Sequence, residues 1–434
     1  MHLPWIPRAA ALAALALAAR AAAAAEPRTL SLEEALRELE SRSPTAAQAR
    51  SRAEEASALV RQAAAPLLPA LSATGSYTRN SDEAKFVKPA LPGQPASTLY
   101  IQPEEAWAAG GTLRLPLVVP TAWADLAAAR HGAAAAREGA EATRLGLRLA
   151  VVQGAWLAAA GEEIASAAER ALATAQEQAR SARRAVDAGI QPPLSALASE
   201  TQAVRREGDL VRARASLEKA QLALGVLLGR AERVRIPVSA PAAGPAPDAA
   251  ALAAEALGRR PEVKAQAEQL AAAESRVTSA WLRLLPQLSA TGSAFYQDVP
   301  FPTGKDRGWR AMVELSWPLY DGGLRYGKRR EAEAAAAGAR AAAEGERLSV
   351  LQEVEDAARE LQVSRERLRL AEHQRSVAAD AAATAKRGFE AGTTGNVEVL
   401  SANDDLFQAE VGLAQARAGL GSAAAALDRA AGRL

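Results

Sequence analysis

Residue types that commonly act in catalysis or bind metals are scarce in this sequence, and their spacing is poorly suited to such chemistry. The chain of 434 residues has three histidines and no cysteine. His131 and His373 each stand alone in an alanine-rich segment, where an exposed histidine is the simpler interpretation. Glu162 and Glu163 are adjacent and would point about 100° apart on a helix, so they are unlike an acid/base pair. The sequence therefore predicts no enzyme, no metal site and no cofactor.

A glycine-rich segment near the C-terminus is also unlike a ligand-binding loop. Residues 392–395, Gly-Thr-Thr-Gly, lack the lysine of a phosphate-binding loop. They also follow a helical segment, whereas a phosphate-binding loop precedes its helix. This segment is better interpreted as a point where the chain reverses direction.

The N-terminus has the outline of a secretory signal peptide, predicted over residues 1–25. Arg8 precedes an apolar run over 9–19, and three alanines before Glu26 offer a cleavage site. Cleavage would remove two of the 52 basic residues, leaving 50 to balance the 50 acidic ones. A neutral mature chain is not expected to bind nucleic acid. Without cysteine it can form no disulfide and carry no lipid on an N-terminal cysteine.

The elements that would position any site occur twice along the chain. The segment from Leu67, Leu-Leu-Pro followed by alternating residues, returns from Leu284, 217 positions later. Towards the C-terminal ends of the two copies the spacing becomes 203, where Gly189 matches Gly392. A chain that repeats one pattern in this way contains one structural unit made twice.

The repeats define the expected domain organisation. The first repeat is predicted over residues 26–235 and the second over 250–434, with a connector rich in proline and alanine at 236–249. The first copy has 15 additional residues, which fall within 81–105. Four prolines in that interval predict an exposed loop.

Two segments in each repeat alternate apolar and polar residues, as a strand with one apolar face does. From Trp309 to Trp317 every second residue is apolar, and the residues between include Arg310 and Glu314. Four strands of about ten residues fit a transmembrane barrel with lipid-facing and lumen-facing sides. The aromatic residues expected at the membrane interfaces are Tyr77, Trp107, Tyr296, Trp309 and Trp317. A soluble sheet is the alternative, but no flanking segment is apolar enough to cover one.

Long alanine-rich segments with helical periodicity fill the rest of each repeat. Each of the longest would extend about 100 Å at about 1.5 Å per residue. On the second, Val354 and Leu370 belong to two apolar series on opposite flanks, which predicts a helix with two neighbours in the wall of a cylinder. No run of 18 apolar residues predicts a transmembrane helix. The expected helical segments are 30–66, 121–188 and 194–229 in the first repeat, and 250–285, 324–391 and 397–432 in the second.

Four strands cannot close a membrane barrel, because the smallest such barrels have about eight strands and an open edge in lipid is very costly. If these strands span a membrane, several chains must share one barrel. Oligomerisation is therefore a consequence of the strand assignment.

This duplicated order of elements resembles the TolC-like outer-membrane efflux family over essentially the whole mature chain. The resemblance rests on Pro44 and Pro261, on the two Leu-Leu-Pro helix ends, and on the reversals at Gly189 and Gly392. It implies an α+β membrane protein, in which three chains share a 12-stranded transmembrane β-barrel and antiparallel helical hairpins form a trimeric α-barrel tunnel. It also implies an outer-membrane location reaching into the periplasm, contact with outer-membrane lipid, a periplasmic adaptor (membrane fusion protein) and an inner-membrane pump.

In that family acidic residues constrict the periplasmic tip, and the resemblance carries this role to Glu398, six residues after Gly392. Ser195 stands at the matching place in the first repeat, where the family often has aspartate. Phe389 and Thr394 replace the family's tyrosine and arginine, so the tip lock formed by those groups is absent or differently built.

Other residues of the returning helices are expected near the tip. Asp404 and Asp405 would add negative charge to the entrance, or else lie on a solvated outer face. Glu398 itself has an alternative role as a helix cap that faces outward. The residues expected to form the reversals or contact the adaptor are Gly189, Leu197, Phe389, Gly392, Thr394 and Leu400.

Two functions are compatible with these patterns. One is an outer-membrane duct of a tripartite efflux or type I secretion system, which passively exports substrates. The other is a periplasmic coiled-coil adaptor or scaffold, which has no need of four amphipathic strands. Nothing in the sequence indicates whether drugs, metal ions or polypeptides pass through such a duct.

The face assignment of the last strand gives a testable prediction. Val313→Arg or Leu315→Arg, on the apolar face, should hinder membrane insertion at a cost of about 2–4 kcal/mol near the bilayer midplane. Met312→Arg, on the polar face, should be milder. The measurement is the folded fraction after insertion into lipid vesicles, and equal losses at both faces would show that the faces are wrongly assigned.

Overall fold

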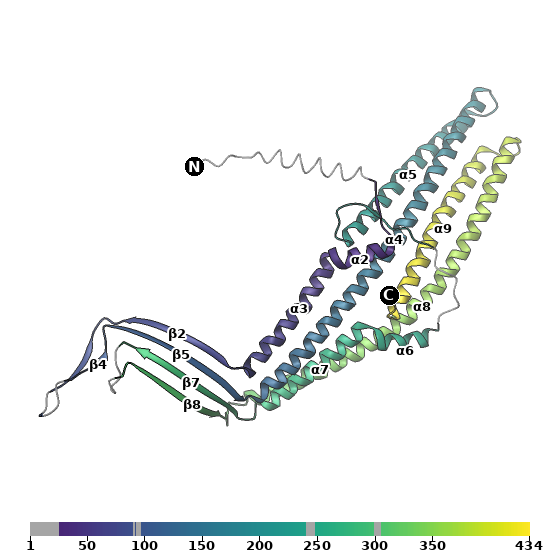
Figure 1. Ribbon diagram of the computed structural model, residues 1–434. Helices are drawn as coiled ribbons and strands as arrows, with labels where there is room; N and C mark the ends of the chain where they lie inside the picture. Colours follow the sequence, from purple (N-terminus) through teal and green to yellow (C-terminus); the bar gives the residue numbers. More distant parts are fainter. Residues whose placement is uncertain (1–25, 90–91, 93–96, 240–247, 299–304) are drawn as a thin grey trace, which may run out of the picture. The chain divides into compact units, whose positions relative to one another are not determined.

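The computed structural model describes residues 26–89, 92, 97–239, 248–298 and 305–434 (Figure 1). The predicted signal peptide and part of the predicted connector lie outside the described residues. The described chain forms two compact units, and each unit draws on both repeats. Unit 1 comprises the residues up to Ser51 with Glu138–Val263 and Gly345–Leu434, and unit 2 comprises Arg52–Arg137 and Lys264–Glu344.

The four alternating segments form one antiparallel sheet in unit 2, in the order β2-β5-β7-β8. The central pair, β5 and β7, joins the first repeat to the second, with Thr112 opposite Ser293. Each outer strand pairs with the other strand of its own repeat. The strands are β2 (Ala70–Arg79), β5 (Glu105–Val118), β7 (Gln287–Gln297) and β8 (Arg307–Ser316).

The outer edges of this sheet are open. Neither β2 nor β8 pairs with a further strand of the described chain. The apolar face of β8 is uncovered as well, since Val313 and Leu315 are 67% and 64% exposed. A long exposed edge is a template for pairing with another chain, and an exposed apolar face indicates an interaction surface.

The interval 81–105, expected as a loop, contains a hairpin. β3 (Ala84–Lys88) and β4 (Ser97–Gln102) pair antiparallel. The loop prediction missed these strands because it was based on prolines, all of which lie outside the two strands. The prolines are Pro89, Pro92, Pro95 and Pro103.

Each first helical stretch, expected at 30–66 and 250–285, divides at a proline. Ser43 and Arg260, which precede the prolines, are extended, with ψ of 124° and 127°. The proline ring disfavours the helical conformation at the residue before it, and so two helices replace one. The four helices are α2 (Leu32–Arg42), α3 (Pro44–Ala64), α6 (Ala249–Arg259) and α7 (Pro261–Leu282). A short 3₁₀ helix, Ala65–Leu67, follows α3.

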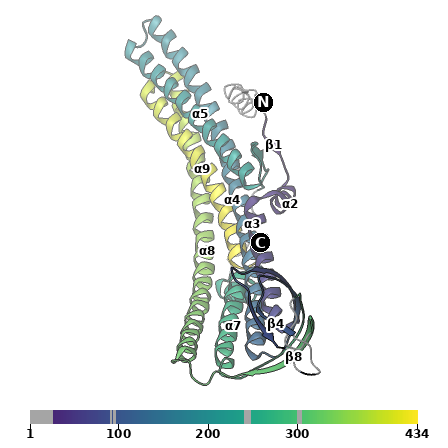
Figure 2. The ribbon, with the colours of Figure 1, turned by 90° about the vertical axis from the view of Figure 1, so that its left-hand side faces the viewer.

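The long helices form two hairpins whose lengths match closely. Within unit 1 the hairpins run side by side in both ribbon views (Figures 1 and 2). The outgoing helices have 68 and 67 residues, and both returning helices have 35. The first hairpin is α4 (Pro120–Asp187) with α5 (Pro193–Leu227), and the second is α8 (Leu324–Glu390) with α9 (Asn396–Ala430).

Two equivalent apolar clusters fasten the short helices α2 and α6 to the hairpins of unit 1. Leu39 of α2 packs with Val151 and Leu224, and Leu252 of α6 packs with Val354. Near the first cluster, β1 (Arg28–Thr29) pairs in parallel with β6 (Val234–Arg235). The duplication seen in the sequence thus recurs in the packing.

Ion pairs hold α2 in place beside its cluster. Arg230, which is nearly buried, donates two hydrogen bonds of 2.6 Å to the carboxylate of Glu38. These bonds hold the pKa of Glu38 below its ordinary value. Arg148 and Arg144 lower the pKa of Glu40 in the same way, by donating hydrogen bonds to its carboxylate. Both carboxylates are therefore favoured in their charged form by the folded chain.

Among the helices that the structure describes, none has an apolar run long enough to cross a membrane.

The hairpins approach closely because small residues lie between them. The indole ring of Trp156 on α4 lies against Gly421 of α9, where an added Cβ would come within 2.0 Å of a ring atom. Both residues belong to unit 1. A ring of this size can pack there only because the facing residue has no side chain.

Gly421→Ala should therefore force the Trp156 ring to move and should destabilise the protein by about 1–3 kcal/mol. Gly412→Ala on the same helix is the control, since an added Cβ there meets no atom within 4 Å. Denaturant unfolding followed by tryptophan fluorescence measures both. A loss at Gly412 equal to that at Gly421 would mean that helix packing is not the cause.

Candidate functional site

Both hairpins of unit 1 reverse through the same backbone turn. Gly189 and Gly392 have φ of 72° and 76°, in the left-handed region that glycine adopts without strain. The N–H of Gly189 donates to the carbonyl of Val186, and that of Gly392 to the carbonyl of Phe389, at 2.9 and 3.1 Å. The predicted reversals are therefore true helix ends of one type, repeated at matching positions.

A buried polar network joins the two hairpins beside these turns. Asn396, the first residue of α9, is 7% exposed, and its Nδ2 donates to Ser199 Oγ at 2.9 Å and to the Ser195 carbonyl at 3.2 Å. Its Oδ1 accepts a hydrogen bond of 2.8 Å from Gln178 Nε2. One asparagine thus links α9 to both helices of the other hairpin. Buried amides are costly when unpaired, so this contact favours one specific arrangement of the tip.

Next to this network lies a buried cation. The side chain of Arg206 on α5 is 5% exposed and donates to Asp209 at 2.9 Å and to Asp404 of α9. Its guanidinium also stacks on Phe407, 4.4 Å from the ring centroid. Two carboxylates and an aromatic face compensate for the lost hydration of the charge.

Two further ion pairs continue the series along α9. Arg170 of α4 contacts Glu410 at 3.0 Å, and Arg417 contacts Glu163 of α4 at 3.1 Å. They border a cavity of about 710 Å³ between α4, α8 and α9. Both pairs reach solvent, although the Glu410 side chain is only 18% exposed, and such pairs contribute little to stability on their own. We call the Asn396 network, the Arg206 cluster and these two pairs the polar ladder.

The structure places Glu398 in the first turn of α9 with its carboxylate folded back. Oε2 lies only 2.6 Å from where a Cβ would stand on Gly395, the N-cap residue. This position over the helix N-terminus suits a carboxylate, because the backbone N–H groups there carry partial positive charge. The side chain is exposed, which leaves it accessible from solvent.

The two aspartates predicted near Glu398 differ in their surroundings. Asp404 is paired with Arg206, so its charge is compensated. Asp405 is exposed. Ser195 contributes to the site through its backbone carbonyl in the Asn396 network.

The remaining tip residues also differ between the repeats. Leu197 is 57% exposed, whereas Leu400 lines a small cavity with Arg206 and Phe407. Phe389 is half-buried, and Thr394 folds its hydroxyl against Gly388. Asn396, Gln178 and Arg206 were missed because a helical polar residue gives no sequence signal of what it faces.

The residues predicted for the membrane interfaces lie at two levels of the sheet in unit 2. Tyr77 and Trp107 are opposite each other, with ring centroids 4.8 Å apart, and Tyr296 is near them in register. Trp309 begins the exposed run of β8, and Trp317 follows that strand. Trp317 lies eight positions after Trp309, which is about 27 Å along a strand and comparable to an apolar band of about 25 Å.

Comparison with known protein families assigns this chain to one of them. A model of the family described as outer membrane efflux protein matches residues 35–230 and 252–433, which is most of the chain. The chain belongs to the outer membrane efflux protein family. The predicted resemblance is thereby confirmed, and the function of an efflux channel is supported over that of a periplasmic adaptor.

Solved structures of bacterial membrane proteins share the fold of this efflux protein. A membrane protein from Pseudomonas aeruginosa has a TM-score of 0.79 at 21% identity, with 92% of this chain and 93% of that one covered. VceC from Vibrio cholerae gives 0.77 at 20% identity and coverage of 92% and 96%. The Campylobacter jejuni CmeC channel gives 0.79 at 17% identity and coverage of 92% and 85%. Comparison with curated protein sequences gives no significant match.

In the part of this efflux protein that the structure describes, no three or more histidine and carboxylate side chains lie close enough together to hold a metal ion.

The buried position of Arg206 predicts a specific stability effect. Arg206→Gln leaves Asp404 without its cation and Asp209 with only the exposed Arg212, and should cost about 1–3 kcal/mol. Arg212→Gln is the matched control, because Arg212 is 79% exposed and pairs only with Asp209 on its own helix. Its effect should stay within about 0.5 kcal/mol. Unfolding followed by circular dichroism compares them, and equal effects would contradict the assigned role of the buried cluster.

Proposed function

We propose that this protein is the homotrimeric outer-membrane duct of a tripartite efflux or type I secretion system. Three copies would share a 12-stranded transmembrane β-barrel, and their hairpins would form a periplasmic α-barrel tunnel. The observation that carries this proposal is the four-stranded sheet with both edges open in the described chain. In lipid those edges must be paired, and β2 of one copy beside β8 of the next would pair them all.

The chemistry of the sheet supports this membrane placement. Its last strand has an uncovered apolar face, and aromatic residues lie at both ends of that face. Such a band with aromatic borders suits lipid on one side and a polar lumen on the other. We further propose export by a cleaved signal peptide at 1–25, followed by repeats at 26–235 and 250–434 around the connector 236–249.

The tip of the hairpins suits a protein partner. Ile190, Leu194, Leu197 and Val397 are large apolar residues beside the reversals, and each is more than half exposed. An exposed apolar group of this kind indicates an interaction surface. Its proposed partner is a periplasmic adaptor, through which an inner-membrane pump would deliver the substrate.

The polar ladder supplies the proposed closure of the tip. Its members connect α9 to α4 or α5, so moving one hairpin away from the other would break them together. The outer ion pairs of the ladder reach solvent and can exchange protein partners for water at small net cost, while the buried Asn396 and Arg206 links favour the closed arrangement. This arrangement would replace the tyrosine and arginine lock that this sequence lacks.

The assembly is tested by native mass measurement of detergent-extracted protein. A homotrimer is expected, because only a shared barrel satisfies the sheet edges. Cross-linking within intact membranes provides an independent check of the same stoichiometry. A stable monomer embedded in lipid would contradict the shared barrel.

The proposed selectivity ring at Glu398 is tested by single-channel recording. Three copies around one axis would attract cations into a narrow entrance. Glu398→Gln removes the charge but retains an oxygen over the helix N-terminus, and should reduce cation preference by at least about twofold. Asp405→Asn is the control and should change it less. Unchanged selectivity in a conducting Glu398→Gln channel would leave Glu398 with a capping role alone.

A further inference from the structure

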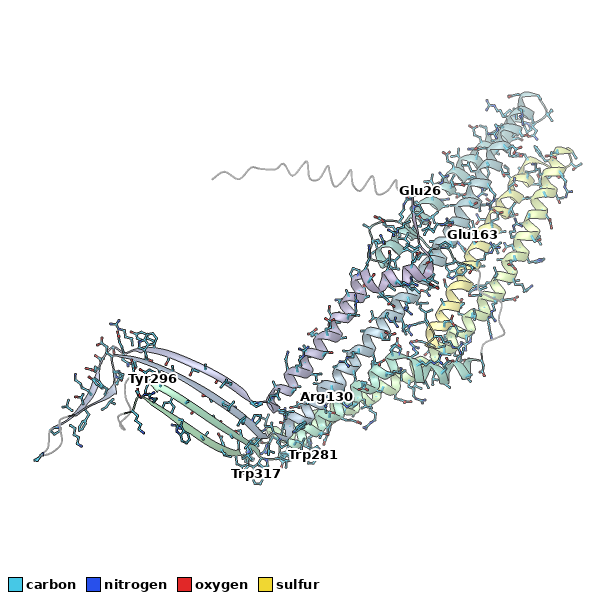
Figure 3. All side chains as sticks on the ribbon, viewed as in Figure 1. Glu26, Arg130, Glu163, Trp281, Tyr296 and Trp317 are labelled. Atoms are coloured by element: carbon cyan, nitrogen blue, oxygen red, sulfur yellow. The ribbon has the colours of Figure 1, made fainter. Side chains whose placement is uncertain are left out.

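Aromatic side chains of unit 2 gather where the sheet meets its helices. Trp317, directly after β8, donates its indole Nε1–H to the carbonyl of Leu284 at 3.1 Å. Nearby on α7, Trp281 is covered by the guanidinium of Arg329 from α8, 4.4 Å from the ring centroid. Figure 3 places Trp281 and Trp317 together at this end of the strands. The ends of α7, β8 and α8 therefore meet at one place, which we call the basic junction.

Exposed cations lie at the ends of the same two helices. Arg283 directly follows α7, and Lys328 and Arg330 lie in the first two turns of α8. All three are exposed, and none has an ion pair within the ranges that the structure describes. Their charges are thus free to interact with a ligand.

The other charged groups of the basic junction are largely compensated. Arg325 donates to Asp321 at 2.7 Å, and Arg329 lies 3.3 Å from Glu333. Glu331 is the exposed acid between these groups. A net positive charge therefore remains at the junction.

Large apolar side chains stand exposed beside the free cations. Tyr320 is 88% exposed and Leu319 is 78% exposed, both in the turn between β8 and α8. Tyr326 and Trp317 are also more than half exposed. A ligand that matches this surface must carry both an anionic group and apolar chains.

The first repeat has the same fold here without the cations. Residues 324–330 correspond to 121–127 at the spacing of 203, and 121–127 contain Trp123 and Asp125 but no lysine or arginine. Arg283 corresponds to Pro66 at the spacing of 217. Because the fold forms in the first repeat without these charges, they are not needed to build the junction in the second.

We propose that the basic junction binds an anionic phospholipid in the periplasm-facing leaflet of the outer membrane. The positive charge of Arg283, Lys328 and Arg330 would attract the anionic headgroup, and the acyl chains would lie along Trp317 and the exposed face of β8. Guanidinium and ammonium groups bind phosphate strongly at a membrane surface, and aromatic rings suit the headgroup level. This inference rests on the proposed membrane placement.

The test is native mass spectrometry of the full-length protein with an equimolar mixture of phosphatidylglycerol and phosphatidylethanolamine of identical acyl chains. The wild type should retain phosphatidylglycerol preferentially, by about fivefold or more. The triple variant Arg283→Gln, Lys328→Gln and Arg330→Gln should lose most of that preference. The control triple variant removes the same charge from exposed positions far along α4 and should retain it: Arg180→Gln, Arg183→Gln and Arg184→Gln.

Each alternative outcome is distinct. Equal retention of the two lipids by the wild type, or equal loss of preference in both triple variants, would overturn the basic junction as a lipid site. Displacement of phosphatidylglycerol by soluble glycerol phosphate at equal concentration would also overturn it, in favour of a free phosphate site. Retention of neither lipid would instead count against the membrane placement itself.

Discussion

The requirement that every backbone N–H and C=O find a partner governs the whole design of this chain. Helices satisfy the requirement internally, but the sheet β2-β5-β7-β8 leaves the outer sides of β2 and β8 open within the described chain. Lipid cannot hydrogen-bond those groups. In the proposed membrane placement a single chain would leave these groups unpaired, and further copies of the chain would pair them. Every part of the proposed duct, from the barrel to the threefold entrance, depends on that pairing.

The helical hairpins combine two kinds of contact with different energetic consequences. Close packing of small residues, as at Gly421 against Trp156, cannot be relaxed without strain. The polar ladder between α9 and the first hairpin combines buried links at Asn396 and Arg206 with ion pairs that water can replace. Hydrogen bonds and ion pairs can be broken without steric strain, so the tips are better suited than the shafts to exchange between arrangements.

Periodicity and duplication were sufficient to predict the four strands of the main sheet, the long helices and both reversals, because each depends on patterns along the chain. The family followed from the resemblance of this duplicated order of elements to a known one. The breaks at Ser43 and Arg260 follow from proline and were open to prediction. The Asn396 network and the Arg206 cluster were not, since they depend on which side chains face each other across helices. The charge of Asp404 was visible in the sequence, but its pairing with Arg206 was not. The β3–β4 hairpin was missed because the prolines that flank its short strands indicated a loop.

The two hairpins have nearly identical lengths, although their sequences have diverged widely. Inserting a residue into one long helix would raise its tip by about 1.5 Å and rotate the face beyond it by about 100°. Over evolutionary time, a change of length in one hairpin should therefore be tolerated only in two cases. Either a second change restores the helix length, or the inserted residues complete whole turns and so restore the facing side. The turns between strands are free of this restriction, and the 15 additional residues of the first repeat lie there. Length variation among descendants of this gene should accumulate at the outer loops and avoid the shafts.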